Sequence, residues 1–394
     1  MFFSFLKKVI KYGKLDIIDY DQKKYSFGSG GDYCLLKFHD KNLKKRLLVN
    51  PDLALGEAYV NKDFTIEEGG LETLIRIATK NYSNLERNSL YKIFYYINHL
   101  FDFFQKTNIL DISKKNVAHH YDINEEIYKL FLDKDMQYSC GYFHNDNVSL
   151  EQAQIDKKNH LIKKLNINRK NLKVLDIGCG WGGMALQIAK DTGAHVKGIT
   201  LSKNQHETAI KRCKELNLDS IVDFELTDYR NINEKYDRII SVGMFEHVGK
   251  EYFNEFFKKI KNILTDDGIM VLHSIGFKGA PYKTNAWIKK YIFPGGYIPS
   301  ISEVVNVIER EDLWINDIEI LRLHYANTLK HWHNNFKKNK EKITNILDDR
   351  FCRMWEFYLL VSEYSFRNMG NMVFQMQITK NQESLPFTRN YMYN

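Results

Sequence analysis

The sequence lacks paired cysteines. Its five cysteines form no C-x-x-C pair and are odd in number; they are Cys34, Cys140, Cys179, Cys213 and Cys352. This usage argues against a disulfide framework and against a zinc site, and it favours a reducing compartment. We therefore expect free thiols and a cytoplasmic protein.

Long hydrophobic runs are also missing. The most apolar stretch, "IFYYINHLFDFF" at 93–104, is interrupted by Asn98, His99 and Asp102, so it falls short of the roughly 20 apolar residues that span a bilayer. The N-terminus has no small-residue cleavage site of the secretory kind. These absences predict a chain that associates with a membrane peripherally, if at all.

The composition is that of a globular protein with an excess of aromatic residues. A chain of 394 residues with 44% hydrophobic and 27% charged residues is expected to form two or three structural units. Aromatic residues make up 14%. This excess indicates either apolar ligands in a greasy groove or a genome with low GC content, and composition alone leaves both open.

Positive charge gathers at the front of the chain. The formal net charge is +8, and residues 1–50 hold eleven Lys and Arg against five Asp and Glu. A basic front end suits an anionic partner, either nucleic acid or an acidic lipid surface. A solvated surface in a lysine-rich organism is the alternative.

The first part of the chain predicts a small α+β unit. In "FFSFLKKVIKYG" the apolar residues Phe2, Phe5 and Val9 share one helical face, which fits either a helix at a membrane interface or one docked on its own core. Strand-like runs follow at 15–19, 23–27 and 33–38, and helical periods follow at 71–80 and 86–106. We place the end of this unit near residue 110.

From residue 172 the pattern changes to alternating strands and helices. Strands are expected at 173–178, 195–201, 221–228, 236–243 and 268–275, with two more at 314–323 and 371–380. A long helical stretch is expected at 325–369. The alternation predicts an α/β domain with a mostly parallel sheet covered by helices on both faces.

A glycine turn follows the first of these strands. In "VLDIGCGWGG" the glycines Gly178, Gly180 and Gly182 let the backbone approach a ligand closely. The D-x-G-x-G form differs from the dinucleotide and phosphate-loop motifs, and it suits a cofactor without phosphates such as S-adenosylmethionine. Thr200, Gln205 and Asp228 follow the next strands, at the edge where an open parallel sheet binds ligands.

Six motifs in order carry a family resemblance. "MQYSCGYF", "VLDIGCGWGG", "GITLSKNQ", "DRIISVGMFEHVG", "LHSIG" and "YIFPGGYIPS" resemble the cyclopropane-fatty-acid synthase family, which includes the mycolic acid cyclopropane synthases. The resemblance runs from about residue 119 to the last strand and implies a Rossmann-like class I methyltransferase fold for residues 111–394. "DLALGEAYVNKDFTIE" resembles the additional lipid-binding domain of the bacterial phospholipid enzymes, which implies a lipid- or membrane-binding domain over residues 1–110.

The resemblance also implies the reaction and its partners. A methylene from S-adenosylmethionine is added across a cis double bond of an unsaturated phospholipid acyl chain. Methyl transfer leaves a carbocation, which aromatic faces can stabilise, and a bound bicarbonate acts as the base. The family implies a homodimer at the inner face of the membrane.

Site residues follow from the resemblance position by position. The bicarbonate is expected at the backbone of Cys140 and Ile275 and at the side chains of Glu246, His273 and Tyr325. Cys140 is thus an amide donor and not a nucleophile. The cofactor is expected at Tyr138, Ser139, Asp176, Gly178, Cys179, Gly180, Thr200, Leu201, Ser202, Gln205, Thr227 and Asp228. No metal is expected, and we assign His119 and His120 a structural or ligand-lining role.

One departure from the family pattern bears on the mechanism. Some members carry a cysteine in the C-terminal helix that has been marked as catalytic, whereas "FYLLVSEYSFR" has Ser362 there. A base held as an anion is therefore the better account for this chain.

Three other functions are alternatives to cyclopropane synthesis: a fatty-acid methyltransferase giving a methyl-branched product, an RNA or protein methyltransferase, and a lipid-binding relative without catalysis. No nucleic-acid module is visible, so nucleic acid is not an expected partner.

Overall fold

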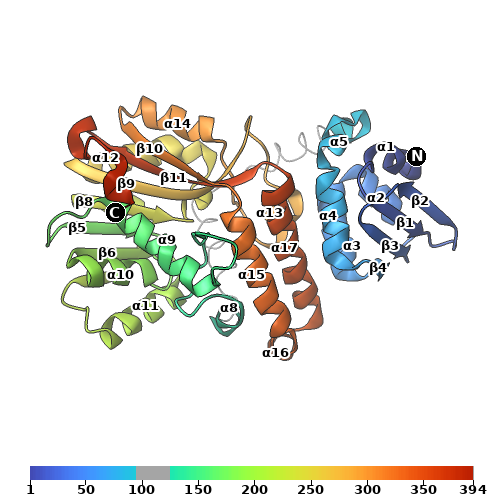
Figure 1. Cartoon of the computed structure of the whole chain (residues 1–394), viewed down its shortest axis with the longest axis horizontal. Coiled ribbons are helices and arrows are strands. Elements are labelled where there is room, and N and C mark those ends of the chain that lie inside the picture. Colours follow the sequence, from blue (N-terminus) through green and yellow to red (C-terminus); the bar gives the residue numbers. More distant parts are fainter. Residues whose placement is uncertain (95–124, 394) are drawn as a thin grey trace. The chain divides into compact units, whose positions relative to one another are not determined.

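The structure is a computed structural model that describes residues 1–94 and 125–393. The chain divides into two compact units (Figure 1). The first unit comprises residues 1–109, 285–293 and 332–370, and the second comprises 110–284, 294–331 and 371–394. The predicted boundary near residue 110 lies outside the described residues and stays a prediction. Two later segments, which the sequence pattern grouped with the catalytic domain, belong to the first unit.

The first unit contains a four-stranded sheet in the order β2-β1-β3-β4. Its strands are β1 (Lys14–Ile18), β2 (Lys24–Gly28), β3 (Tyr33–Phe38) and β4 (Phe64–Glu68). β1 pairs antiparallel to β2 and parallel to β3, and β3 pairs antiparallel to β4. The predicted α+β character of this region is confirmed.

Helices of the first unit come from distant parts of the sequence. The early ones are α1 (Phe2–Val9), α2 (Leu43–Val49), α3 (Pro51–Asn61), α4 (Gly70–Lys80) and α5 (Tyr82–Arg87). The later ones are α13 (Ala286–Tyr291), α16 (Lys340–Ile346) and α17 (Asp349–Asn368). α17 packs on α3 and α4, and α13 packs on α3. The predicted helical stretch 325–369 is therefore three helices: α15 (His324–Lys338), α16 and α17.

The apolar face of α1 is docked on its own unit. Phe2, Phe5 and Val9 are buried, while Lys7 and Lys8 are exposed. Phe3 stacks on Tyr25 with ring centroids 3.8 Å apart. Of the two sequence interpretations, the structure shows the helix docked on its own core.

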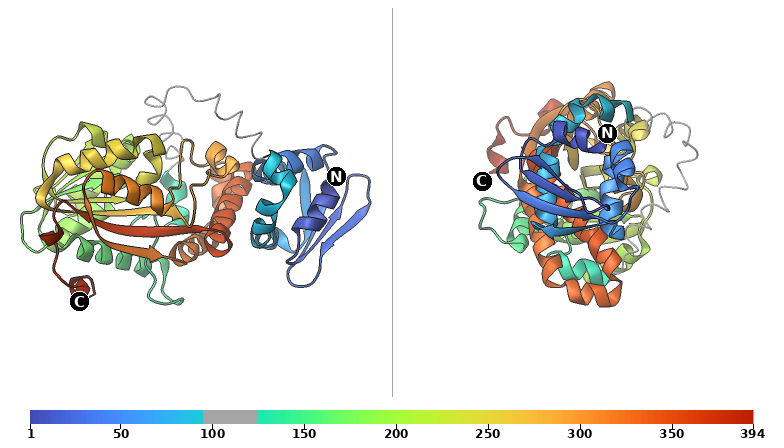
Figure 2. Two further views of the ribbon diagram at one scale, coloured as in Figure 1. Left: turned by 90° about the horizontal axis from the view of Figure 1, so that it is seen from above. Right: turned by 90° about the vertical axis from the view of Figure 1, so that its right-hand side faces the viewer.

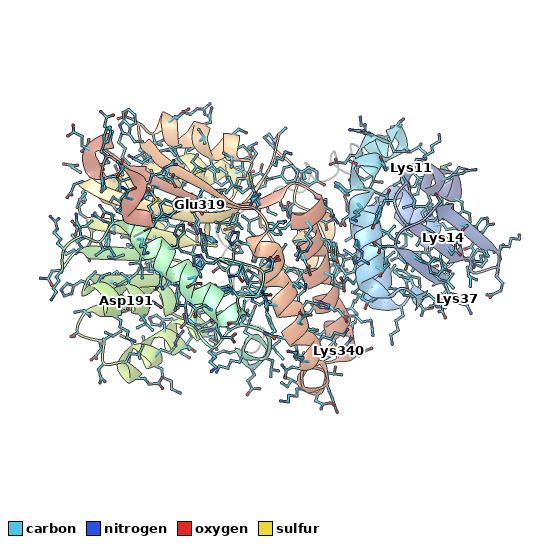
Figure 3. The ribbon with its side chains drawn as sticks, viewed as in Figure 1. Lys11, Lys14, Lys37, Asp191, Glu319 and Lys340 are labelled. Carbon is cyan, nitrogen blue, oxygen red and sulfur yellow. The ribbon has the colours of Figure 1, made fainter. Side chains whose placement is uncertain are left out.

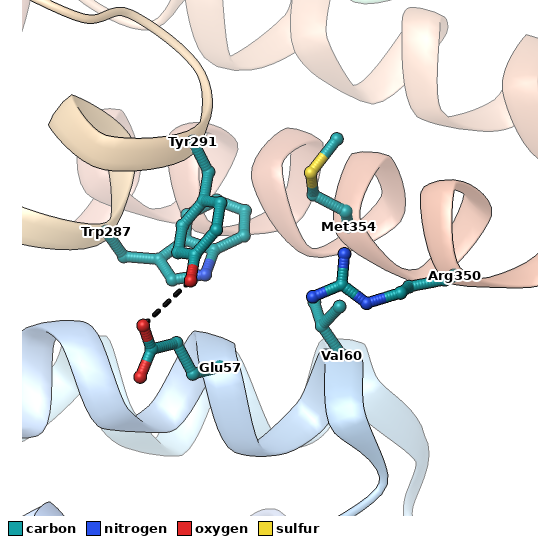
Figure 4. Close-up of a pocket in the computed structure, with 6 residues that line it drawn as sticks. All are labelled: Glu57, Val60, Trp287, Tyr291, Arg350 and Met354. Carbon is teal, nitrogen blue, oxygen red and sulfur yellow. Dashed lines mark hydrogen bonds between the residues drawn. The ribbon is translucent and has the colours of Figure 1, made fainter.

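A small pocket marks the packing of α3 against α13 and α17 (Figure 4). It is lined by Glu57, Val60, Trp287, Tyr291, Arg350 and Met354. The Tyr291 hydroxyl and the Lys290 ammonium each donate to Glu57 Oε1 at 2.8 Å. These polar contacts fix α13 to α3 within the first unit.

We expect Gly56→Ala to destabilise the protein, although alanine is the better helix former by about 0.5–1 kcal/mol. A Cβ at Gly56 would lie 2.5 Å from the Trp287 ring and 2.8 Å from Phe357. Overpacking of this kind costs about 1–3 kcal/mol. The free energy of unfolding is measured by urea titration. In a Trp287→Phe background the smaller ring should reduce the cost; an equal cost there would show that α3 and α13 do not pack in this way.

The second unit contains a seven-stranded sheet in the order β10-β11-β9-β8-β5-β6-β7. The strands are β5 (Lys173–Ile177), β6 (His195–Thr200), β7 (Val222–Leu226), β8 (Tyr236–Val242), β9 (Leu264–Phe277), β10 (Trp314–Leu321) and β11 (Asn371–Thr379). β5 to β9 run parallel, and β11 runs antiparallel to both of its neighbours, β9 and β10, so β10 has the same direction as β9. All seven predicted strands and the α/β class are confirmed.

Helices cover both faces of this sheet (Figure 2). Because neighbouring strand residues point to opposite faces, Leu175 and Val174 of β5 enter different cores. One core includes residues of α12 (Phe253–Ile263) and α14 (Ile301–Arg310). The other includes residues of α9 (Leu150–Leu165), α10 (Gly183–Thr192) and α11 (Lys203–Glu215). Among the described residues, no helix has the length and hydropathy of a membrane span.

Candidate active site

The glycine turn lies at the carboxyl end of β5, in the centre of the sheet. Gly178, Gly180 and Gly182 have φ of +81°, +55° and +84°, a region where other residues are strained. The N–H groups of Gly178 and Cys179 both donate to Ile199 O of β6 at 2.9 Å. Glycine is favoured at these positions because the tight turn between β5 and α10 requires positive φ.

The three glycines have different surroundings. A Cβ at Gly178 would lie 2.7 Å from Met244, and one at Gly182 would lie 2.7 Å from the Phe224 ring. A Cβ at Gly180 would meet nothing within 4 Å. Gly178 and Gly182 thus allow close packing of the protein, whereas Gly180 borders open space that can admit a ligand.

Asp176 lies at the end of β5, just before this turn. Its side chain is buried, and Oδ2 has no hydrogen-bond partner among the described residues. Burial raises its pKa to about 7. Burial also raises the pKa of the neighbouring Cys179 thiol. A buried, unpartnered carboxyl oxygen beside an open glycine is suited to a cationic or donor-bearing cofactor such as S-adenosylmethionine.

The end of β6 carries a closed polar cluster. Thr200 Oγ1 donates to Gln205 Oε1 at 2.9 Å, and Ser202 caps α11 by accepting from Gln205 N. Thr200 O accepts from Thr227 N at 3.1 Å, which ties this loop to the end of β7. Leu201 lies between Thr200 and Ser202 in the same loop. The structure thus brings five of the expected cofactor residues together.

Asp228 is paired inside the protein. Its carboxylate accepts from Arg230 N, Nε and Nη2 at 2.9, 2.8 and 2.7 Å. The carboxylate in turn raises the pKa of the Arg230 guanidinium. Any further bond that Asp228 accepts therefore shares its oxygens with Arg230, a pairing that the sequence analysis did not anticipate.

The segment that holds Tyr138, Ser139 and Cys140 belongs to the second unit, with Ser139 and Cys140 buried and Tyr138 partly exposed. A Cβ at Gly243, after β8, would lie 3.9 Å from Ser139, and one at Gly183 would lie 2.4 Å from Gln137. The Tyr138 ring packs edge-on against Tyr128 at 5.3 Å. The segment therefore lies beside both the glycine turn and the end of β8.

The Cys140 thiol is poorly suited to be a nucleophile. It is 1% exposed, its Sγ donates to Gly141 O, and burial raises its pKa far above the usual range. A thiol nucleophile reacts as the thiolate. The Cys140 N–H, in contrast, has no hydrogen-bond partner among the described residues.

Glu246 and Ile275 form a hydrogen-bonded pair next to His273. Ile275 N donates to Glu246 Oε1 at 2.7 Å, and Glu246 Oε2 is buried without a partner among the described residues. Burial raises the Glu246 pKa to about 7, although hydrogen bonds from the Ile275 amide and the Ser274 hydroxyl lower it. The Ile275 amide is thus engaged in holding Glu246, which gives this residue an indirect place in the expected anion site.

His273 is neutral and oriented. It lies two residues before Ile275 on β9, so both side chains are on one face. Burial lowers its pKa well below the usual range, and Gln375 Nε2 bonds Nδ1 at 3.1 Å. With Gln375 as the donor, the imidazole carries its proton on Nε2. Gly243 N donates to His273 O, which places His273 at the loop that leads to Glu246.

Tyr325 is in the first turn of α15, which is tied to the Cys140 segment. Gly141 N donates to Thr328 Oγ1 at 3.0 Å, and Phe143 N donates to His324 Nδ1 at 2.9 Å. Tyr325 itself is 8% exposed.

Three further residues of the sequence analysis lie elsewhere. His119 and His120 lie outside the described residues, and Ser362 is in α17 of the first unit.

Two residues of this region were missed from the sequence. Gln154 and Lys157 of α9 are buried and hydrogen-bonded to the 137–139 segment. A signal was present: Lys157 is four residues from both Ala153 and Leu161, so it occupies the apolar face of α9. A lysine there indicates a buried polar partner.

Comparison with known proteins gives two matches to family models. Residues 110–376 match mycolic acid cyclopropane synthetase, and residues 4–89 match a domain of unknown function. A "probable fatty acid methyltransferase" of Pseudomonas putida is 37% identical over 288 residues, covering 70% of this chain and 73% of that protein. The cyclopropane-fatty-acyl-phospholipid synthase of Escherichia coli K12 is 36% identical over 265 residues, covering 67% and 68%.

Solved structures agree with the sequence matches. The cyclopropane synthase MmaA2 of Mycobacterium tuberculosis is 30% identical with a TM-score of 0.64, covering 67% of this chain and 97% of that one. The mycolic acid cyclopropane synthase CmaA1 complexed with SAH and CTAB gives the same values. The resemblance inferred from six motifs is thereby confirmed. The chain belongs to the mycolic acid cyclopropane synthetase family and is an S-adenosylmethionine-dependent methyltransferase.

Proposed function

We propose that this enzyme is a cyclopropane-fatty-acyl-phospholipid synthase that uses bicarbonate as its base. The observation that carries the proposal is the unpartnered Glu246 Oε2, buried beside His273 at the carboxyl edge of the sheet. The similarity to the E. coli synthase supports the substrate class. The similarity to CmaA1, solved with SAH, supports the cofactor.

The side chains and backbone N–H groups of this site are better suited to binding an anion than to nucleophilic catalysis by a cysteine. The Cys140 N–H and the His273 Nε2–H are donors, and Glu246 with a pKa of about 7 can donate from Oε2 when protonated. To hold bicarbonate, a buried site needs hydrogen-bond donors that have no acceptor within the protein. Tyr325, in the helical turn beside Cys140, completes the proposed set.

The proposed chemistry accounts for the buried surroundings. When bound, S-adenosylmethionine supplies an electrophilic methyl group, and bicarbonate supplies a base. The alkene forms one new bond to that methyl carbon as the sulfur–carbon bond breaks, which leaves a cation on the acyl chain. Loss of one proton from the transferred methyl closes the ring. The protein's part is to hold these groups in line and to keep out water, which would capture the cation.

The product identifies the function directly. Cells that express the enzyme are expected to convert unsaturated fatty esters into species 14 mass units heavier without a double bond, as seen by gas chromatography with mass spectrometry. A methyl-branched product that keeps its unsaturation would instead favour fatty-acid methylation. That second candidate is supported by the P. putida relative and by a tuberculostearic acid methyltransferase, UfaA1, that is 33% identical.

The first unit is proposed to bind the membrane surface at the cytoplasmic side. Lys7 and Lys8 of α1, Lys11 after that helix and Lys14 of β1 are exposed, and Figure 3 shows Lys11, Lys14 and Lys37 on this unit. Clustered lysines attract anionic lipids within a Debye length. A homodimer, also proposed, would add avidity by presenting two such units to one membrane.

Vesicle binding tests this role of the first unit. Replacing Lys7, Lys8 and Lys11 by glutamine should weaken sedimentation with anionic vesicles about tenfold or more, because each lysine near the surface contributes about 1 kcal/mol. Raised salt should weaken binding of the parent protein. Glutamine at Lys203, Lys211 and Lys214, exposed on α11 of the second unit, is the control. Equal binding of the parent to neutral and anionic vesicles at low salt would contradict the electrostatic role.

A further inference from the structure

Two buried side chains of α9 form hydrogen bonds to Ser139, the residue before Cys140. Gln154 Nε2 donates to Ser139 O at 2.9 Å, and Lys157 Nζ donates to Ser139 Oγ at 2.9 Å. Gln154 and Lys157 are 1% and 0% exposed. Ser139 is therefore held to α9 by both its carbonyl and its hydroxyl.

The hydrogen bond from Gln154 to Ser139 O determines the direction of the Cys140 N–H. The described peptide bonds are all trans, and in a trans peptide the C=O and the following N–H point to opposite sides. Since Ser139 O points at Gln154, the Cys140 N–H points away from α9. The next N–H, of Gly141, is held by Thr328 of α15. The peptide that presents the Cys140 donor is thus fixed on both sides.

The groups proposed to contact the anion carry no positive charge of their own. The Cys140 N–H and the neutral His273 contribute dipoles only, and Glu246 contributes either a neutral or a negative group. Placing an anion in a buried site costs free energy unless an opposite charge is near. The Lys157 ammonium acts electrostatically on both Cys140 and His273, and on Asp176 as well.

We propose that Lys157, together with Gln154, is the positioning residue of the anion site: it orients the Cys140 N–H through Ser139 and supplies the positive charge that balances the bound bicarbonate. The inference rests on the proposed function. It extends that function to two residues of α9 that are not in the proposed anion-binding set.

Further bonds link Lys157 to the glycine turn. Lys157 Nζ also donates to Gln137 Oε1 at 2.5 Å, and Gln137 Nε2 donates to Asp135 Oδ2 at 3.0 Å. Asp135 pairs with Arg212 of α11, which donates to Trp181 O in the turn at 2.8 Å. A continuous chain of hydrogen bonds therefore joins the Cys140 segment to the cofactor side of the site.

The decisive variant is Lys157→Met, which keeps the length of the side chain and removes its charge and donors. Lys163→Met is the control, because Lys163 is an exposed lysine of the same helix. Binding of sodium bicarbonate, with sodium chloride as the reference salt, is measured by calorimetry in the presence of S-adenosylhomocysteine. We expect Lys157→Met to weaken bicarbonate binding about ten- to a hundredfold, as for loss of a charged hydrogen-bond partner, and Lys163→Met to leave it unchanged.

The pH dependence distinguishes a charge from a purely structural role. Burial, with a contribution from Lys158, lowers the Lys157 pKa to about 8. The side chain is positive below that pH and loses its charge above it. Bicarbonate affinity of the parent protein should therefore fall as pH rises through about 8, and Lys157→Met should lack this step. Other titratable groups face Lys157 from neighbouring elements, and they are shared by both proteins: Asp133, Asp135, Lys158, Cys140, Asp176 and His273.

Each result has a definite meaning. Bicarbonate binding in Lys157→Met equal to that of the parent would overturn the inference and leave the proposed function intact. A parent that binds no bicarbonate would instead overturn the bicarbonate part of the proposed function. If Lys157→Met does not fold, Gln154→Leu tests the same orientation, with the exposed Gln152→Leu as its control; unchanged bicarbonate affinity in a folded Gln154→Leu would overturn the inference.

Discussion

Turnover of unsaturated phospholipid vesicles is expected to fall by about two to four orders of magnitude in Glu246→Ala and in His273→Ala, the range that general-base catalysis contributes. Both changes remove a side chain that the proposal places around the base. Cys140→Ser should be far milder, because serine keeps the backbone N–H and nearly the same volume. A nucleophilic thiol would give the reverse order, since loss of the sulfur would then cost most of the rate.

Glu246→Gln sharpens this comparison. Glutamine can still accept from Ile275 N and still donate from its other end, as a protonated Glu246 would. We therefore expect Glu246→Gln to retain more activity than Glu246→Ala. Glu255→Ala, at an exposed position of α12, is the control for loss of a carboxylate.

The assay is run with and without added bicarbonate, and S-adenosylmethionine binding verifies that each variant is folded. Two results would contradict the assignment. One is a Cys140→Ser protein that binds cofactor and has no activity. The other is normal turnover by Glu246→Ala in bicarbonate-depleted buffer.

Gly180→Val is expected to reduce S-adenosylmethionine affinity by about a hundredfold or more, which corresponds to about 2.8 kcal/mol. The space beside Gly180 is free of protein atoms to 4 Å, and the branched side chain would fill it. The positive φ of +55° adds backbone strain of about 1–2 kcal/mol for any residue with a Cβ. Affinity is measured by calorimetry.

A control variant separates the effect of backbone strain on cofactor affinity from the effect of filling the space beside Gly180. Gly30 in the β2–β3 turn has φ of +74° and likewise meets nothing within 4 Å. Gly30→Val therefore imposes a comparable backbone strain in the other unit and should leave cofactor affinity unchanged. Unchanged affinity in a folded Gly180→Val protein would rule out this placement of the cofactor.

The strands and the catalytic motifs could be predicted because their signals are local. β5 and its glycine turn occupy ten consecutive residues, and "GITLSKNQ" contains the whole Thr200–Gln205 cluster. A short apolar run and a glycine turn with positive φ involve consecutive residues, so a single sequence displays them. Glu246 and His273 were predicted only through the family motifs that surround them.

What the sequence did not reveal depends on distant partners. The hydrogen bond from Lys157 to Ser139 joins residues 18 positions apart. The assignment of α13 and α17 to the first unit depends on packing across more than 200 residues. The segments that make such contacts do not identify their partners: a lysine on the apolar face of α9 indicates a buried polar partner, but not that the partner is Ser139.

The interleaved first unit has a consequence for synthesis on the ribosome. Its N-terminal helices α3 and α4 emerge early, but α13 and α17, which pack on them, are translated only after residue 285. Until then the surface around Gly56 that receives Trp287 and Phe357 has no cover. Vectorial folding therefore cannot complete the first unit before the second has been translated almost to its last strand, and a fragment ending near residue 110 would leave the ribosome with that apolar surface open to chaperones.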